Sequence, residues 1–323
     1  MSALHMRELD PAADYPSYLY VHNSVYREYP RTEQELRHED SHRNPAHLFE
    51  RWVVEVNGDV VALGECSHTT WIFHPHRFFV GCTVHPEYEG RGIGGALYRH
   101  LIERLEPHRP VSLRSMARED MARAVRFLQD RGFVEDMRAW ESRLDVPGFD
   151  ASPYNGAVER VLGQGIEIRS LAELRSDPEH VRKLYDLDEE LSWDVPRPEP
   201  EFTMPPFELW AETFRTNPNV LPKGYLVAVD NGEYVGVTQL WNSQSGGEFY
   251  TGLTGVKRSH RRRGIALALK LRSIEFAKQQ GVARLKTWNE SGNRPMLAIN
   301  EALGYVKQPA WIDFKKSVAQ ETE

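Results

Sequence analysis

Two glycine-containing segments carry the residues of this chain whose types and spacing suit the binding of an anion. One runs from Val84 to Leu97 and the other from Val256 to Leu269, and each places a glycine directly before an apolar helical pattern. A helix that begins there leaves its first backbone N–H groups open, and its dipole favours negative charge. Glycine lets an anion approach the backbone closely, and neighbouring arginines add charge-assisted hydrogen bonds. The expected ligand of such a segment is a pyrophosphate.

The residues expected to bind this anion come from both segments. In the first segment they are Val84, Arg91, Gly92, Ile93, Gly94 and Gly95. In the second segment they are Val256, Arg261, Arg262, Arg263, Gly264, Ile265 and Ala266. The second segment has three consecutive arginines before its glycine, whereas the first has Glu89 at the position of Arg261. Because an acidic group facing a pyrophosphate is unfavourable, binding is predicted more firmly for the second segment.

The two segments belong to a repeat. Val84 and Val256 are 172 residues apart, and the same spacing aligns Phe133 with Tyr305. Matches in the same order and nearly the same register predict two copies of one domain. The predicted domains are residues 1–146 and 166–323, and the Gly- and Pro-rich residues 147–165 are the linker between them.

Each copy shows the same sequence of expected elements. A strand and a charged helical region come first, followed by two strands that meet at an Asn-Gly pair, Asn57-Gly58 or Asn231-Gly232. Asn-Gly between β-branched residues is a strong hairpin signal, because a type I′ turn needs positive φ at both central residues. An apolar strand then leads into the glycine segment and its helix. A strand, a second helix and a last strand are expected to close each copy.

Composition excludes several classes of protein. The chain has 323 residues, a formal net charge of −7 and two cysteines. The cysteine count excludes a disulfide scaffold and suits a cytoplasmic location, and the acidic balance disfavours a nucleic-acid coat protein. Apolar runs long enough to span a membrane are absent from the sequence. The histidines show no firm metal-ligand spacing, so no metal is expected.

Two other pyrophosphate motifs compete with the pattern above. Neither copy contains GxxxxGK[ST], the pattern of a P-loop. The dinucleotide fingerprint GxGxxG occurs once, at Gly90, Gly92 and Gly95, but Arg114 stands in the strand where an acidic residue would select NAD. An NADP-linked oxidoreductase therefore remains an alternative.

The pattern [RQ]-x-x-G-x-[GA] after a strand ending in valine resembles motif A of the GNAT acyl-CoA N-acetyltransferases. Arg261, Gly264 and Ala266 match it fully, and the first copy departs from it at Glu89. Residues 287–305 resemble the fifth strand and following helix of the family. The resemblance implies an α/β (α+β) fold of two tandem GNAT-like domains, each a mixed, mostly antiparallel sheet with splayed central strands flanked by helices. The two-domain layout is also similar to that of mycothiol synthase.

The resemblance also implies a reaction and its co-substrate. Acetyl-CoA would lie where two central strands splay apart, and the amine of a small molecule would attack its thioester directly. Asn289 and Asn293 would face the pantetheine arm, and Asn300 is a further candidate cofactor-binding residue. Asp194 is the candidate base, and Tyr250 is a candidate acid or a wall of the pocket. The C-terminal copy matches the family's site residues at more positions than the N-terminal copy does, so the chemistry is expected in the C-terminal copy. Residues 192–210 lie where the family builds its substrate lid.

A non-enzymatic alternative also remains open. The tyrosine that often protonates the leaving thiolate in this family is replaced by Asn300 in the second copy and by Leu128 in the first. A CoA-binding regulatory protein without turnover is therefore an alternative. For either function, the repeat predicts a monomer whose two halves pack as an internal pseudo-dimer.

Overall fold

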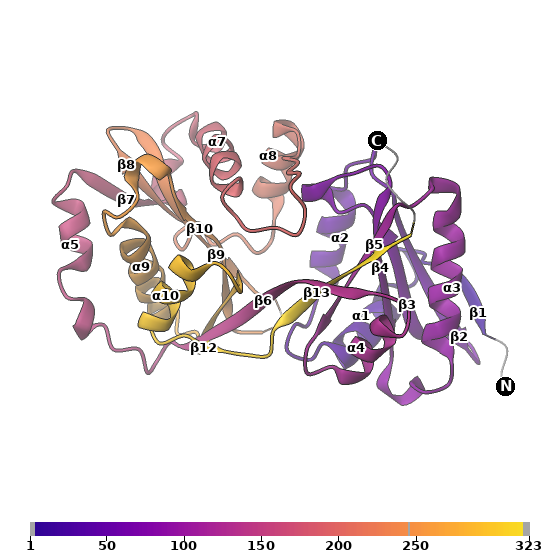
Figure 1. The fold of residues 1–323 in the computed structure, drawn as a ribbon. Helices are drawn as coiled ribbons and strands as arrows, with labels where there is room; N and C mark the ends of the chain where they lie inside the picture. The colour runs from indigo at the N-terminus through magenta and orange to yellow at the C-terminus, as the bar shows by residue number, and fades with distance from the viewer. Residues whose placement is uncertain (1–3, 245, 319–323) are drawn as a thin grey trace. The chain divides into compact units, whose positions relative to one another are not determined.

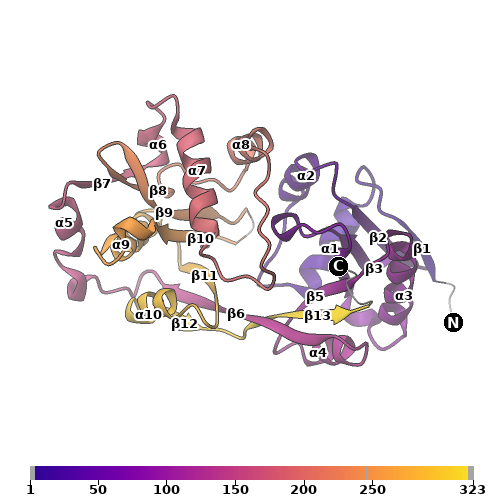
Figure 2. The ribbon, with the colours of Figure 1, turned by 45° about the horizontal axis from the view of Figure 1, so that its top comes forward.

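The computed structural model describes residues 4–244 and 246–318, and it divides into two compact units. The N-terminal unit comprises the chain up to Arg138, the segment Pro198–Pro205 and the chain from Trp311 onward. The C-terminal unit comprises Ala139–Arg197 and Pro206–Ala310. Each unit therefore contains residues from both halves of the sequence. Figures 1 and 2 label the elements of both units.

The N-terminal unit is a mixed sheet with helices against it. Its strands are β1 (His5–Glu8), β2 (Phe49–Val56), β3 (Asp59–Ser67), β4 (Arg77–Val84), β5 (Ser112–Arg118) and β13 (Trp311–Ser317). Its helices are α1 (Tyr15–Val25), α2 (Glu33–Ser41), α3 (Ile93–Leu105) and α4 (Ala122–Gln129). The strand order is β1-β2-β3-β4-β5-β13, and only β4 and β5 are parallel among these pairs. The apolar face of α3 packs on β3 and β4 and forms the core of the unit.

The C-terminal unit repeats this arrangement. Its strands are β7 (Ile166–Ser170), β8 (Leu226–Asp230), β9 (Glu233–Asn242), β10 (Phe249–Val256), β11 (Arg284–Glu290), β12 (Val306–Lys307) and most of β6 (Val134–Asp145). Its helices are α5 (Ala157–Leu162), α6 (Leu171–Leu174), α7 (His180–Ser192), α8 (Phe207–Thr216), α9 (Ile265–Gln279) and α10 (Arg294–Ala302). The order is β7-β8-β9-β10-β11-β6, with β12 also paired to β6.

Both Asn-Gly hairpins form as expected. Asn57 and Gly58 have φ of 55° and 91°, and Asn231 and Gly232 have φ of 49° and 84°. These are the positive values that a type I′ turn requires at its two central positions. The turns join β2 to β3 and β8 to β9, and so fix the register of the strands that lead to each glycine segment.

The expectation that the last strand of each copy closes its own copy is wrong. Ala139–Asp145 of β6 pair with β11 in the C-terminal unit, while β13 pairs with β5 in the N-terminal unit along Trp311–Ser317. In Figure 1, β13 is accordingly a yellow strand among violet ones. Because the two copies share one fold, the open edges of β5 and β11 are equivalent, and sequence pattern alone cannot select which strand covers which edge.

The central strands splay apart in both units, as the family resemblance implied. The parallel pairing of β4 with β5 covers only Arg77–Phe79, although both strands continue further. Likewise β10 pairs with β11 only over Phe249–Thr251. Once parallel pairing stops, the backbone groups on the facing edges are left open, and each unit has a gap in the middle of its sheet.

The segment Pro198–Pro205 is anchored in the N-terminal unit by a buried carboxylate. Glu199 Oε1 accepts hydrogen bonds from Arg114 on β5 at 2.9 Å and from Lys315 on β13 at 2.8 Å, and its Oε2 lies 3.3 Å from the Arg77 guanidinium on β4. Part of the segment expected to be a lid over the C-terminal copy therefore joins three strands of the other unit.

Replacing Glu199 by glutamine is expected to destabilise the protein by about 2 kcal/mol, because the amide cannot accept all three charged donors in their buried places. Chemical denaturation followed by circular dichroism measures this change. Glu201→Gln is the matched control, since Glu201 also pairs with Arg77 but its side chain is 42% exposed. Its effect should stay below about 1 kcal/mol. Equal effects of the two variants would show that Glu199 does not anchor the segment.

Candidate functional site

The two glycine segments adopt the same backbone conformation at the start of their helices. In the N-terminal unit Gly90 and Gly92 have φ of 78° and 80°, and in the C-terminal unit Arg262 and Gly264 have φ of 63° and 85°. Gly92 and Gly264 are the N-cap residues of α3 and α9. Alternation of left- and right-handed residues turns successive N–H groups toward one side, which makes a concave anion site. The loop that the sequence predicts to bind a pyrophosphate therefore has the same backbone conformation in both units.

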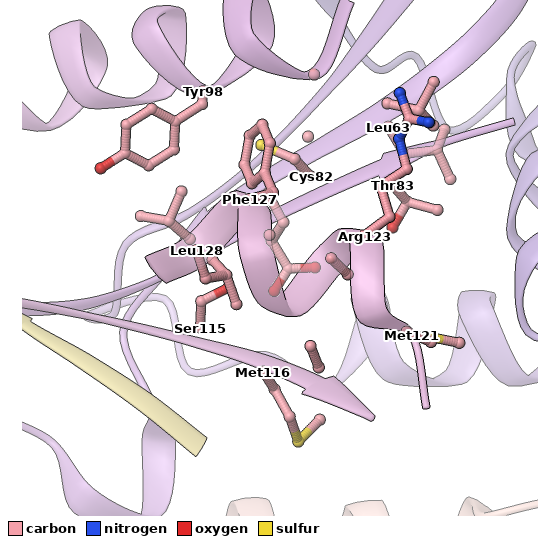
Figure 3. A pocket seen from close by; sticks show the side chains of 18 of the residues that line it. Leu63, Cys82, Thr83, Tyr98, Ser115, Met116, Met121, Arg123, Phe127 and Leu128 are labelled. Carbon is pink, nitrogen blue, oxygen red and sulfur yellow. The ribbon is translucent and has the colours of Figure 1, made fainter. Parts of the chain in front are cut away.

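A cavity of about 790 Å³ opens beside the loop of the N-terminal unit (Figure 3). Its wall includes Val84, Gly92, Ile93, Gly94 and Gly95 of the predicted site. Further lining comes from β4 and β5 beyond Phe79 and Arg114, where the pairing of the two strands has ended. This volume is within the usual range of small-molecule pockets. The cavity thus joins the anion loop to the gap in the sheet.

Two arginines of the α4 region supply the positive charge that the first loop lacks. A Cβ at Gly90 would lie 3.2 Å from the Arg123 guanidinium, and one at Gly95 would lie 3.2 Å from that of Arg131. Arg123 also lies 3.5 Å from the carboxylate of Glu89. The acidic residue that disfavoured this loop in the sequence is therefore paired with Arg123, and Arg131 adds a second cation, so that both arginines line the cavity.

Aromatic side chains of α1 and its following turn line another part of the cavity. His22 lies 4.9 Å from the ring of Tyr26, and burial lowers the pKa of His22 below its ordinary value of 6.5. The Tyr26 side chain interacts with Thr83 of β4, and burial raises the pKa of the Tyr26 hydroxyl. A neutral imidazole and a protonated phenol, both within one cavity, suit the roles of base and acid.

The loop of the C-terminal unit has its arginines engaged with its own carboxylates. Arg261 pairs with Asp194 and donates from Nε to the Val256 carbonyl at 3.1 Å. Arg263 lies 3.4 Å from Asp230. The arginines Arg258 and Arg261 hold the pKa of Asp194 below its ordinary range, a direction opposite to that required of a base at neutral pH.

The other predicted residues of the C-terminal unit separate into two groups. Asn300, on α10, donates to Asn289 Oδ1 on β11 at 2.6 Å, so these two side chains lie together. Asn293 instead caps α10, and its side-chain oxygen accepts from the Met296 N–H at 3.4 Å. Tyr250 packs edge-on against Trp288, with 6.3 Å between ring centroids.

In the N-terminal unit, Arg91 does not line the cavity. Its guanidinium donates to the Glu87 carbonyl at 2.9 Å and lies 4.9 Å from the Tyr88 ring. Arg123 and Arg131, which do line the cavity, were missed by sequence reasoning. With the 172-residue spacing, Arg123 corresponds to Pro295 and Arg131 corresponds to Leu303 in the second copy. The presence of a cation in one copy where the other has an apolar residue is the sequence signal that could have identified them.

Residues 4–244 and 246–318 contain neither a cluster of metal ligands nor a helix that could span a membrane. No group of three or more His, Cys, Asp or Glu side chains in these residues could hold a metal ion. None of the helices in the same residues is long and apolar enough to cross a bilayer.

Comparisons with known proteins agree with this geometry. The chain resembles a tandem GNAT protein from the clavulanic acid biosynthesis pathway, with 19% identity, a TM-score of 0.75 and coverage of 99% of this chain and 100% of the other. It also resembles a GCN5-related N-acetyltransferase from Sphaerobacter thermophilus, with 19% identity, a TM-score of 0.70 and coverage of 99% and 97%. No curated protein matches it significantly. The model of the acetyltransferase (GNAT) family matches residues 15–133 and 184–305. The glycine loop and the splayed sheet occur in both units, and the family model matches most of the chain. The chain therefore belongs to the acetyltransferase (GNAT) family and is an enzyme of the N-acetyltransferase type.

Proposed function

We propose that the protein transfers an acetyl group from acetyl-CoA to the amine of a small molecule, and that the N-terminal unit holds the acetyl-CoA. The observation that carries this proposal is the cavity of about 790 Å³. The cavity runs from the loop in which Gly90 and Gly92 have positive φ to the gap between β4 and β5. The proposal therefore differs from the expectation drawn from the sequence, in which the loop arginines favoured the C-terminal copy.

The loop and the gap fit the two parts of such a co-substrate. The N–H groups after Gly92, with Arg123 and Arg131 beside them, would bind the pyrophosphate. The open edges of β4 and β5 would bond the amide groups of the pantetheine arm. Acetyl-CoA supplies the acetyl group in the activated form of a thioester.

The aromatic part of the cavity would receive the amine. His22, neutral because burial lowers its pKa, would take the proton of the ammonium. Tyr26, beside Thr83 of β4, would give a proton to the leaving thiolate. Holding the amine against the strand that carries the thioester would make the attack effectively unimolecular.

The C-terminal unit remains a second candidate for the chemistry, as the sequence predicted. A specific feature supports it: the pairing of β10 with β9 shifts register between Thr251 and Thr254, whereas the pairing of β4 with β3 has no such shift. A bulge re-aims backbone groups and is often found next to an active site.

The proposed function is tested by thiol release from acetyl-CoA in the presence of polyamines, amino sugars and amino acids, with mass spectrometry of the product. We expect at least one amine to gain an acetyl group at a rate that depends on the enzyme. Acetyl-CoA binding without turnover across the panel would favour the regulatory alternative. Thermal stabilisation by NADPH and not by acetyl-CoA would favour the oxidoreductase alternative.

A further inference from the structure

A tryptophan from the last strand of the chain completes the wall of the cavity in the N-terminal unit. Trp311 is the first residue of β13, and it pairs with Arg118 of β5. It lines the cavity together with Tyr26 and Tyr29, which follow α1. The centroid of the Trp311 ring lies 5.4 Å from that of Tyr29 and 6.1 Å from that of Tyr26. Three aromatic rings from two distant parts of the sequence therefore meet at one wall of the cavity.

The equivalent position in the C-terminal unit is occupied by an alanine. With the 172-residue spacing, Arg118 corresponds to Glu290 and Trp311 corresponds to Ala139. The structure agrees with this correspondence, because Ala139 pairs with Glu290 of β11 as Trp311 pairs with Arg118 of β5. The exchange of last strands therefore brings a large ring beside the gap of one unit and a methyl group beside the gap of the other. The shared fold does not require this ring, which is particular to the N-terminal unit.

The three rings keep part of their surface open to the cavity. Trp311, Tyr26 and Tyr29 are each half-buried, and each contributes to the cavity wall. The plane of the Tyr29 ring lies at 68° to that of Trp311, and the Tyr26 ring is tilted by 35° to it. Neither tyrosine therefore covers the indole by stacking flat on it. Arg118 supports this arrangement, because its guanidinium donates to the Tyr29 hydroxyl at 3.4 Å.

The charged side chains of the cavity wall disfavour a polyvalent cation as the acceptor. Among the described residues, the carboxylates that line the cavity are Glu65 and Glu89. Glu89 lies 3.5 Å from the guanidinium of Arg123, and Glu65 lies 3.7 Å from that of Arg51. Because both carboxylates already have a cationic partner, the wall offers little negative charge to complement a polyamine. A monoamine with an apolar body fits this wall better.

We propose that the acceptor is a primary amine that carries an aromatic ring, and that Trp311 is the residue that determines this specificity. The ring of the acceptor packs against Trp311, with Tyr26 and Tyr29 beside it, in the edge-to-face and offset-stacked arrangements that aromatic pairs prefer. The proposal rests on the proposed function, because it places the acceptor in the cavity of the N-terminal unit. In the transfer, the amine nitrogen forms a bond to the acetyl carbon and the C–S bond of the thioester breaks. The ammonium gives up its protons to the base and on forming the amide, and the CoA thiolate takes one up.

A matched pair of amines and a polyamine test the class of acceptor. The pair is 2-phenylethylamine and 2-cyclohexylethylamine, which are primary amines of the same length, but only the first has an aromatic ring. We expect kcat/KM for 2-phenylethylamine to exceed that for 2-cyclohexylethylamine about fivefold, the effect of one well-placed aromatic pair. It should exceed that for spermidine by more than this factor, because spermidine lacks a ring and carries further charges. Equal rates for the matched pair, or faster acetylation of spermidine, would overturn the proposal.

Binding without transfer separates this proposal from the proposed function. Titration calorimetry of the full chain with 2-phenylethylamine is carried out in the presence of CoA, which has no acetyl group to transfer. Tighter binding of 2-phenylethylamine than of 2-cyclohexylethylamine, with no acetylation from acetyl-CoA, would support the aromatic site and contradict the proposed function. No binding of 2-phenylethylamine at millimolar concentration would overturn the aromatic site, whichever other amine is acetylated.

Two variants and one control assign the preference to Trp311. Trp311→Leu should reduce the preference for 2-phenylethylamine over 2-cyclohexylethylamine from about fivefold to less than about twofold, with the affinity for acetyl-CoA unchanged. Trp311→Phe keeps an aromatic ring and should retain most of the preference, which distinguishes a loss of specificity from a loss of folding. The control is Trp71→Leu, because Trp71 is 44% exposed and is not among the residues that line the cavity. It should keep the wild-type preference. A wild-type preference in Trp311→Leu would contradict the assigned role of Trp311.

Discussion

Gly92→Asp is expected to weaken acetyl-CoA binding at least a hundredfold, about 2.7 kcal/mol. Gly92 is the N-cap of α3, and a Cβ there would have no atom within 4 Å. An aspartate at this position accepts hydrogen bonds from the first N–H groups of the helix, which are the groups that the pyrophosphate needs. Its charge also repels the ligand. Titration calorimetry with acetyl-CoA measures the loss.

Gly264→Asp is the matched control for this variant. Gly264 is the N-cap of α9 with φ of 85°, against 80° for Gly92, so both substitutions carry similar backbone strain. If the N-terminal unit holds acetyl-CoA, Gly264→Asp leaves the affinity within about twofold of the wild type. A loss confined to Gly264→Asp would place the ligand in the C-terminal unit, as the loop arginines predicted.

His22→Phe is expected to lower kcat/KM for the acetylated amine about a hundredfold or more, the usual contribution of a general base. Phenylalanine keeps an aromatic ring between Tyr18 and Tyr26 but cannot accept a proton. Acetyl-CoA affinity should not change, because His22 is not part of the loop. Steady-state thiol release, with the best amine of the panel, measures the change.

The pH profile separates a chemical from a structural role of His22. Burial lowers the pKa of His22 below 6.5, so His22 is neutral at pH 7. The fall of kcat/KM on the acid side of the wild-type pH profile, its acid limb, should therefore lie below pH 6.5. His22→Phe should lose this limb. His76→Phe, outside the cavity, should keep both the rate and the limb. A variant that is slow at every pH but retains the limb would contradict a role as base.

The features that depend on neighbouring residues could be predicted from the sequence. The Asn-Gly hairpins form because those two residue types tolerate positive φ. The loops form because a glycine stands at each N-cap, and the repeat then extends the prediction from one copy to the other. The splayed sheet followed from the family resemblance.

The features that depend on distant residues could not be predicted in the same way. Arg131 is far from Gly95 in the sequence but lies beside it in the folded chain. The residues of the first loop therefore do not reveal, by themselves, that this cation is close to them. Conversely, Asp194 engages Arg261, so the arginines of the second loop carry less free charge than they suggest in the sequence.

The exchange of last strands had the same origin. Residues 134–145 have the pattern of a strand that could pair with either β5 or β11. The edges of these two strands are equivalent, because they belong to copies of one fold. The choice between them is made by packing, as where Leu144 of β6 joins the core around Leu285 and Tyr305. Such a choice has no signature in local pattern or turn chemistry.

Hydrogen–deuterium exchange of the unmodified protein, with and without acetyl-CoA, tests most directly whether the N-terminal unit holds the co-substrate. Amides that bond a ligand exchange more slowly. We predict that acetyl-CoA protects the amides of residues 90–96, at the start of α3, and of residues 115–117, where β5 lines the cavity. Protection confined to residues 262–268, or no protection at either loop, would contradict the account.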